Sequence, residues 1–153
     1  ARHHGLTGRA GGTAGRLSSA RVPAREPIVV DASAMVDALT GTPPGALVVE
    51  RLRGHRLHAP AHLDAEIISA LARLHRAGKL TDHQVGARLH SAAAATITRH
   101  AVAPLLAGAW KRRDDVRMVD ALYVELAHRL GGLPLITTDA RLASVVPNAE
   151  VVV

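Results

Sequence analysis

The sequence predicts an α/β fold with a mainly parallel central sheet and helices on both faces. Short β-branched runs alternate along the chain with longer segments whose apolar residues recur at helical spacing. At Asp31 and at Asp139, such a run is followed by an acid and then by a helical pattern. Strands that alternate with helices imply right-handed crossovers, which align the strands in parallel and place helices on both sides. The 153 residues are enough for one domain of this kind.

The formal net charge of +6 is concentrated near the N-terminus. Residues 1–26 hold five arginines against one acid, Glu26, whereas the rest of the chain has 14 basic and 12 acidic residues. Residues 1–27 also carry five of the thirteen glycines and lack apolar periodicity. We therefore expect a disordered basic tail at 1–27, followed by a folded domain at 28–153.

Composition excludes several kinds of site. The absence of Cys excludes disulfides, thiolate zinc sites and Cys nucleophiles. No segment approaches the roughly 18 continuous apolar residues of a membrane span, and residues 1–27 lack the apolar core of a signal peptide, so we expect a cytoplasmic protein without membrane contact. With one Trp, one Tyr and no Phe, stacking of bases on an aromatic platform is disfavoured. A bound nucleic acid would be held mainly through its phosphate backbone.

The first half of the domain is expected to contain two strands and three helices. The β-branched run at 28–30 ends at Asp31, and Pro44 suits the first turn of a helix. The helix that follows Pro60 has its apolar residues on one face. The expected elements are a strand at 28–30, a helix at 34–39, a helix at 44–52, a strand at 56–59 and a helix at 63–74.

The second half has clear helix start and stop signals. Thr81 and Gln84 match a capping box, Pro104 begins a short helix, and the pair Gly131 and Gly132 ends another. The expected elements are a helix from 82 to the Ala-rich stretch 92–95, a strand at 96–102, a short helix at 104–110, a helix at 119–130 with one apolar stripe on the core, a strand at 133–137, a short helix after Asp139, and a closing strand at 150–153.

Four carboxylates are expected near one edge of this sheet. Ligands of parallel sheets bind beyond the carboxyl ends of the strands, and Asp31 and Asp139 directly follow strands. Glu66 and Asp120 lie early in helices that begin near the same edge, each on the flank of its helix's apolar stripe. The N-terminus of its helix also favours the ionised form of Asp120. The four acids could therefore meet in one cleft.

Each acid taken alone has a simpler explanation. An Asp between a strand and a helix is a common N-cap, and a first-turn Asp is favoured by the helix dipole. A Glu at the margin of an apolar face is commonly a surface residue. A zinc site is a further alternative, because His55, His58 and His62 have the spacing H-x2-H-x3-H. These histidines flank a strand and a Pro turn, however, so one helix face cannot present all three.

Four converging carboxylates would favour a metal ion. Clustered carboxylates repel one another unless a cation neutralises them. All-oxygen ligands favour Mg²⁺ or Mn²⁺, and this setting suits phosphodiester hydrolysis by a metal-activated water. The absence of a glycine-rich phosphate loop disfavours a nucleotide-binding sheet. A phosphatase with a nucleophilic Asp31 is disfavoured because no second acid stands two positions on.

Several segments resemble the PIN-domain ribonucleases, in particular the VapC-type toxins of toxin–antitoxin pairs. These segments are IVVDASAMV at 28–36, AHLDAEIISALARL at 61–74, MVDALYVELAHRLGGLPLITTDARLA at 118–143 and the closing valine strand. The resemblance spans about residues 28–153 and includes all four acids in order. It implies a PIN-like fold and a metal-dependent endoribonuclease that uses Mg²⁺, for which Mn²⁺ can substitute. The metal-binding catalytic acids that it implies are Asp31, Glu66, Asp120 and Asp139.

The resemblance also implies partners and supporting residues. It implies a homodimer held inactive by a cognate antitoxin, whose segment occupies the catalytic cleft, in a complex that can be larger than a dimer. Ser33, Thr137 and Thr138 flank the first and last acids and are candidates to support them. The alternative is a catalytically silent PIN scaffold that only dimerises or binds an antitoxin or RNA. Arginines close in sequence to the acids are candidate contacts for RNA phosphates: Arg112, Arg113, Arg117 and Arg141.

Overall fold

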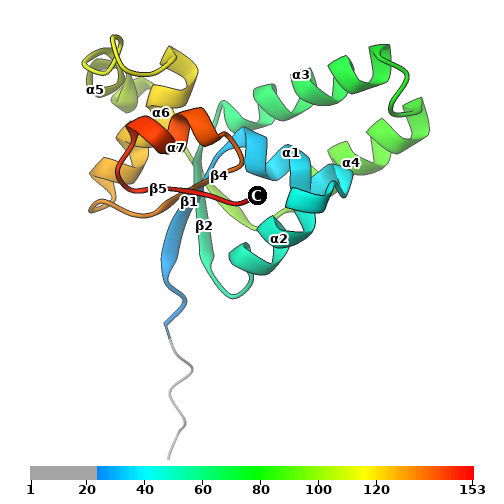
Figure 1. The fold of residues 1–153 in the computed structure, drawn as a ribbon, viewed down its shortest axis with the longest axis horizontal. Coiled ribbons are helices and arrows are strands. Elements are labelled where there is room, and N and C mark those ends of the chain that lie inside the picture. Colours follow the sequence, from blue (N-terminus) through cyan, green and yellow to red (C-terminus); the bar gives the residue numbers. More distant parts are fainter. Residues whose placement is uncertain (1–23) are drawn as a thin grey trace, which may run out of the picture.

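Residues 24–153 are described by a computed structural model, in which they form one five-stranded sheet. The strands are β1 (Pro27–Val30), β2 (Arg56–Pro60), β3 (Ile97–His100), β4 (Leu135–Thr137) and β5 (Ala149–Val151). Their order is β3-β2-β1-β4-β5, and every neighbouring pair is parallel (Figure 1). The predicted parallel sheet is therefore confirmed. Of the predicted tail at 1–27, residues 1–23 lie outside the described residues, and Pro27 already belongs to β1.

Helices connect the strands and cover both faces of the sheet. They are α1 (Ala32–Thr40), α2 (Pro43–Leu52), α3 (Leu63–Arg76), α4 (Asp82–Ala94), the 3-10 turn η1 (Ala103–Leu105), α5 (Leu106–Trp110), α6 (Met118–Arg129) and α7 (Ala140–Val145). In Figure 1, α1 to α4 lie on one side of the sheet and α5 to α7 on the other, as right-handed crossovers in this strand order require. None of the helices within residues 24–153 is both long enough and apolar enough to span a membrane.

Several helices begin at a residue whose side chain caps them. The Asp31 carboxylate accepts a hydrogen bond from the backbone of α1, and the Thr42 hydroxyl does the same for α2. The predicted capping box at the start of α4 is present, with Thr81 and Gln84 bonded reciprocally. Local side-chain chemistry thus sets the starting points of α1, α2 and α4, whereas α3 and α6 begin without a side-chain cap.

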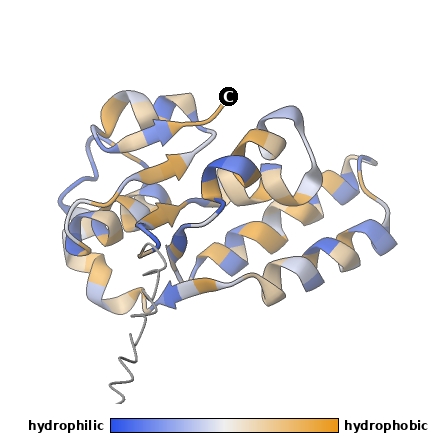
Figure 2. Cartoon of the chain, turned by 90° about the horizontal axis from the view of Figure 1, so that it is seen from below, coloured by the Kyte–Doolittle hydropathy of each residue, from blue (hydrophilic) through white to orange (hydrophobic). Residues whose placement is uncertain are grey.

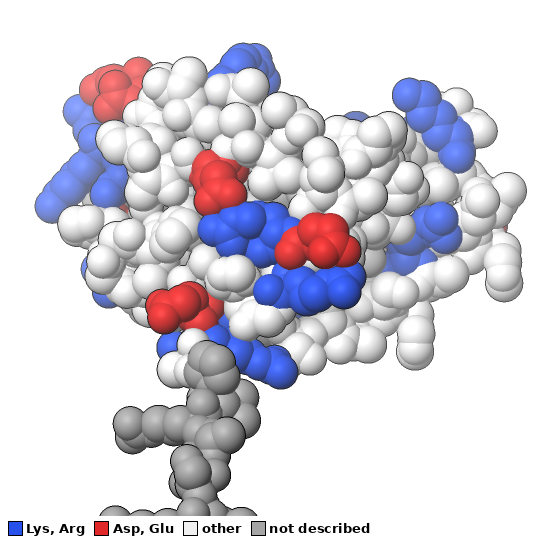
Figure 3. Space-filling view, turned by 60° about the horizontal axis from the view of Figure 1, so that its bottom comes forward, with Lys and Arg blue, Asp and Glu red and all other residues white. Residues whose placement is uncertain are grey.

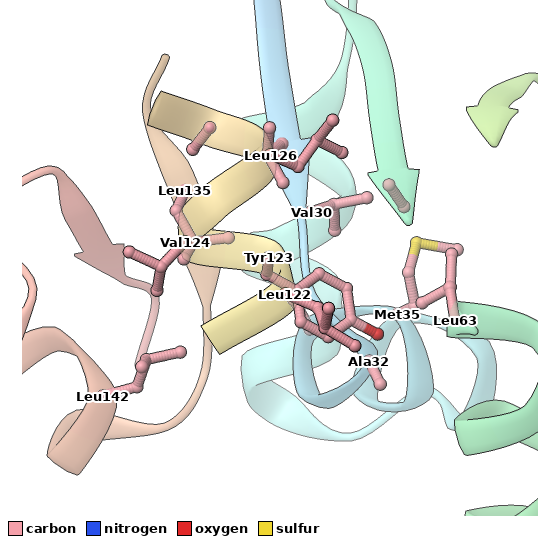
Figure 4. Close-up of a cluster of buried hydrophobic side chains, with 14 of the residues drawn as sticks. Val30, Ala32, Met35, Leu63, Leu122, Tyr123, Val124, Leu126, Leu135 and Leu142 are labelled. Carbon is pink, nitrogen blue, oxygen red and sulfur yellow. The ribbon is translucent and has the colours of Figure 1, made fainter. Parts of the chain in front are cut away.

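The core lies on both sides of the central strands. Figure 2 shows hydrophobic residues along these strands, surrounded by helices that carry both hydrophobic and hydrophilic residues. In Figure 4, the fully buried Tyr123 of α6 lies beside Ala32 and Met35 of α1, and its hydroxyl points toward the side of the cluster that holds Leu63, at the start of α3. Val30 of β1 is buried in the same cluster. Tyr123 therefore joins three elements that surround the ends of the strands.

The helix α6 differs from its predicted pattern. The prediction was a single apolar stripe including Val119, but every residue from Ala121 to Ala127 is buried, whereas Val119 is 45% exposed. The reason is that Val119 and Asp120, in the first turn of α6, line an open cleft, while the following turns are buried. The strand after it begins at Leu135 rather than at Leu133, because the Leu133 N–H donates to the Ala127 carbonyl and closes the end of α6.

The surface below the sheet carries mixed charge. Figure 3 shows that acidic side chains on this face lie beside basic ones. Among the ion pairs of the described residues, one joins Arg51 of α2 to Glu150 of β5, with 2.6 Å between Nε and Oε1. In the described part of the chain, the basic side chains visible on this face therefore lie close to acidic ones.

Candidate active site

Asp31 is the most buried of the four predicted acids, with an exposed fraction of 4%. Its Oδ1 accepts hydrogen bonds from Ala34 N (2.9 Å) and Ser33 Oγ (2.7 Å), and its Oδ2 accepts one from Thr137 Oγ1 (2.5 Å). Burial raises the pKa of Asp31 from 3.8 to about 6; these hydrogen bonds oppose the rise, and the charge of Asp120 adds to it. These hydrogen bonds hold the Asp31 carboxylate in one orientation. They do not fully compensate for the loss of hydration that burial imposes on its charged form.

The three hydroxyl residues Ser33, Thr137 and Thr138 join the end of β1 to the end of β4. Ser33 Oγ lies 3.1 Å from Thr137 Oγ1 and accepts a hydrogen bond from Thr138 N at 3.1 Å. Thr137 Oγ1 also accepts one from Asp139 N at 3.0 Å. Because the buried Thr137 bonds both the Asp31 carboxylate and the backbone of Asp139, it fixes the position of one acid relative to the other.

Asp139 and Asp120 each have an arginine beside them. Asp139 Oδ1 accepts a hydrogen bond from Arg141 N at 2.9 Å, and Arg141 Nε lies 3.8 Å from the same oxygen. Asp120 Oδ2 accepts a hydrogen bond from Arg117 Nε at 2.7 Å, and this bond raises the pKa of Arg117 above its ordinary value. The Arg117 side chain is mostly exposed, whereas that of Asp120 is mostly buried. The arginines thus partly offset the charge of two acids from the solvent side.

Glu66 lies in the first turn of α3, between His62 and Tyr123. Burial and the charge of Glu66 raise the pKa of the Tyr123 hydroxyl, which stays protonated and lies 3.5 Å from Glu66 Oε2. His62 Nε2 lies 3.2 Å from Glu66 Oε1, but its hydrogen bond goes to the Val119 carbonyl oxygen at 3.0 Å. Within residues 24–153, Glu66 Oε1 is therefore buried without a hydrogen-bond partner. Such an oxygen calls for a cation or a donor.

One cleft of about 620 Å³ is lined by all four acids. It opens beyond the carboxyl ends of β1 and β4, where the strand order reverses and where ligands of open α/β sheets bind. Residues of α1, α3 and α6 form its walls. Asp31 and Asp139 also cap helices α1 and α7, as expected for an Asp between a strand and a helix. Asp139 uses only one carboxylate oxygen for its cap. Capping and a role in the cleft are compatible.

The four carboxylates fit a cation by their charge, although they are not arranged around one. Within the described residues, no three acidic or histidine side chains stand close enough together to hold a metal ion. Two observations nevertheless favour positive charge in the cleft: Glu66 Oε1 has no partner, and the burial of Asp31 opposes its ionisation. A hard divalent cation would relieve both, because its preferred ligands are carboxylate oxygens.

The zinc alternative is wrong for the described residues, because its three histidines point to different places. His55 lies beside Arg51, with 3.3 Å between Nε2 and Nη1, and His62 lines the acidic cleft. His58 Nδ1 lies 2.9 Å from His100 Nε2, and burial, aided by the charges of His100 and Arg56, lowers the pKa of His58. The three therefore share no site.

Of the four candidate arginines, only Arg117 lines the acidic cleft. Arg141 borders a smaller hollow that also touches Asp120 and Asp139. Arg113 stacks on Trp110, with its guanidinium carbon 5.1 Å from the ring centroid.

Arg112 is held by groups away from the cleft. Its Nη1 donates to Glu125 Oε2 at 2.6 Å and to the Gly108 carbonyl at 2.8 Å. Glu125 is buried and needs this partner, so the structure gives Arg112 a structural role, and its contact with an RNA phosphate stays a prediction.

Sequence reasoning missed several residues of the cleft. Asp37 lines it, and its two carboxylate oxygens accept hydrogen bonds from Thr42 Oγ1 (2.9 Å) and Thr138 Oγ1 (2.7 Å). Arg73 also lines the cleft, seven positions after Glu66 on α3. That spacing puts the two side chains on one helix face and was available in the sequence. The bond of Asp37 to Thr138, by contrast, joins positions 101 apart and depends on how α1 packs beside the end of β4.

Comparisons with known proteins bear on the family and the fold. The family model described as PIN domain matches residues 28–146. Ribonuclease VapC3 of Mycobacterium tuberculosis is 52% identical over 128 residues, which cover 83% of this chain and 93% of that protein. The crystal structure of PAE2754 from Pyrobaculum aerophilum has a TM-score of 0.61 at 22% identity and covers 84% of each chain. A chain in a toxin–antitoxin complex from Klebsiella pneumoniae has a TM-score of 0.55 at 13% identity, covering 82% of this chain and 98% of that one.

Proposed function

This chain belongs to the PIN-domain family and, within it, to the VapC ribonucleases, and we propose that it is a metal-dependent endoribonuclease acting as the toxin of a toxin–antitoxin pair. The observation that carries the proposal is that four acids from four separate segments line one cleft at the carboxyl ends of the central strands. Similarity to Ribonuclease VapC3 supports RNA as the substrate. The structural likeness to a chain of a toxin–antitoxin complex fits an antitoxin as partner, and a homodimer remains our expectation.

The cation would be Mg²⁺, with Mn²⁺ as a substitute, held by the four carboxylates. When bound, it would make a coordinated water more acidic and offset negative charge on the phosphate. Ser33, Ala34 and Thr137 keep the Asp31 carboxylate oriented before any ligand arrives. Tyr123 and His62 border Glu66 and leave its Oε1 without a donor, so this oxygen is available as a ligand. Arg117 lies at the rim, where it can approach the RNA backbone.

The experiment that tests the proposal is a titration of Mg²⁺ or Mn²⁺ with the purified protein and a labelled pool of cellular RNA. Asp139→Asn is assayed in parallel, because it removes one charge from the cleft while keeping the size of the side chain. Asp114→Asn is the matched control, since the Asp114 side chain is 84% exposed and lies outside the cleft. We expect metal-dependent cleavage by the parent and by Asp114→Asn, and a loss of at least a hundredfold in Asp139→Asn, typical of removing an electrostatic group from a catalytic site.

Other results would select the alternatives. Cleavage by Asp139→Asn at the parental rate would show that the site is elsewhere. No cleavage by the parent with either metal, together with binding to the cognate antitoxin, would favour the silent scaffold. If the chain is a toxin, adding the cognate antitoxin should stop the cleavage.

A further inference from the structure

The acidic cleft continues along α3 beyond the four acids. Glu66, Ser69, Ala70 and Arg73 all line it, at the spacing i, i+3, i+4 and i+7 of a single helix face. Seven residues of α-helix rise by about 10 Å, so Arg73 stands about two turns from Glu66. The cleft thus has an acidic end at the strands and a basic group farther along α3.

Arg73 differs from Arg112, Arg117 and Arg141 because no acidic side chain of the described residues forms an ion pair with it. Arg117 donates to Asp120 at 2.7 Å, Arg141 lies 3.8 Å from Asp139, and Arg112 is paired with Glu125 at 2.6 Å. Among residues 24–153, Arg73 has neither an ion pair nor a hydrogen bond from its guanidinium, and it is exposed.

The wall of the cleft that α1 forms offers Arg73 no ion-pair partner. Val36 and Asp37 of α1 line this wall. Both oxygens of Asp37 accept hydrogen bonds from threonines and do not pair with Arg73. An RNA strand with one phosphate at the acids would meet repulsion from neighbouring carboxylates, which a cation farther along the path offsets.

We infer that Arg73 binds a backbone phosphate of the RNA away from the scissile bond, so that the strand lies in the cleft along α3. At the ~3.4 Å rise per nucleotide of a stacked strand, the ~10 Å between Glu66 and Arg73 corresponds to about three nucleotides. The inference rests on the proposed function, because it takes the acidic end of the cleft as the cleavage site. It assigns phosphate as the ligand and does not assign a base preference.

Binding of a single-stranded RNA oligonucleotide in EDTA tests this contact without cleavage. Arg73→Ala is compared with Arg76→Ala, which removes the same charge from the same last turn of α3 but lies outside the cleft lining. We expect Arg73→Ala to weaken binding by about three- to tenfold and to reduce the slope of log K against log salt by about 0.7, the value for one phosphate contact on a single strand. Arg76→Ala should change both much less. Equal effects of the two variants would overturn the inference.

A second arm locates the phosphate. Under cleavage conditions Arg73→Ala should raise KM and leave kcat near the parental value, because a contact distant from the reacting bond binds substrate and transition state alike. Replacing single phosphates by neutral methylphosphonates should identify one position, about three nucleotides from the cut, at which parent and Arg73→Ala bind equally. If no position has this property, the inference is wrong.

The two proposals fail in different ways. Cleavage by the parent with Arg73→Ala indistinguishable from Arg76→Ala would leave the ribonuclease intact and remove the RNA path. Absence of cleavage together with a specific loss of RNA binding in Arg73→Ala would reject the nuclease and retain the phosphate contact. If Arg73→Ala weakens only binding to the cognate antitoxin, the inference is wrong and the basic end of the cleft serves a protein.

Discussion

Asp31 is subject to opposing influences on its ionisation. Its hydrogen bonds to Ser33, Ala34 and Thr137 favour the charged form, but burial outweighs them and raises its pKa to about 6. A group whose pKa is raised by folding contributes stability that is fully present below its unfolded value, here 3.8, and is lost as the pH rises through about 6. Without metal, the parent should therefore lose stability across this window.

Asp31→Asn should remove this loss. The amide stays neutral at every pH in the window and keeps the size of the carboxyl group. Between pH 4 and pH 8, the free energy of unfolding of the parent should fall relative to that of the variant by up to about 3 kcal/mol, from ~1.4 kcal/mol for each pKa unit. Urea unfolding in EDTA at the two pH values measures the difference. A constant difference between the proteins at both pH values would contradict the assignment of the raised pKa to Asp31.

The residues that could be predicted from the sequence are those whose position follows from local pattern. Asp31 directly follows β1 and Asp139 comes two positions after the end of β4, so their place at the sheet edge needs only the order of elements. Arg112 could not be separated from Arg117 in this way, because the difference lies in which acid each one meets after packing. Arg112 meets the buried Glu125, a contact between two helices that no local pattern encodes.

The helices α1 and α2 approach each other closely at Gly45. The helix α2 contains Gly45, and a Cβ there would overlap the carbonyl oxygen of Asp37 in α1. Because this neighbour is backbone, rotation of a side chain cannot relieve the overlap. The same Asp37 binds Thr138, next to Asp139, so the junction also supports the cleft.

Gly45→Ala should destabilise the protein by about 1–3 kcal/mol, the usual cost of overpacking. It should also lower cleavage, because displacement of Asp37 disturbs Thr138. Gly86→Ala in α4 is the matched control: a Cβ there meets nothing within 4 Å, and Ala is favoured over Gly in a helix by about 0.5–1 kcal/mol. Urea unfolding of both variants should therefore give opposite signs. Equal stability changes would contradict the close contact of α1 with α2.

The elements themselves were predicted well where they carry start signals and less well where tertiary contacts decide their ends. The capping box at Thr81 and Gln84 fixed the start of α4. The start of β4 was misplaced because Leu133 is bonded to the end of α6, and Val119 was placed in the core because its spacing matches the buried residues of that helix. Periodicity cannot tell how far a helix extends past the edge of a sheet.

The whole molecule should respond to the proposed metal, because a ligand that binds only the folded state raises its stability. At a concentration of Mn²⁺ about one hundred times Kd, the gain is about 2.7 kcal/mol. We expect the midpoint of thermal unfolding to rise with Mn²⁺ in the parent and in Asp114→Asn, and to rise much less in Asp139→Asn. Scanning calorimetry with and without EDTA measures this shift. An equal rise in Asp139→Asn would exclude Asp139 as a ligand.

The order of the strands also bears on how the protein is made. β1 stands in the middle of the sheet, and 106 positions separate Asp31 from Thr137, which orients it from β4. A nascent chain that has released Asp31, Glu66 and Asp120 from the ribosome still lacks β4 and Asp139, which caps the helix after it. If cleavage needs all four acids, as we propose, a growing polypeptide should not cut RNA. An antitoxin would then be needed only once β4 has entered the sheet.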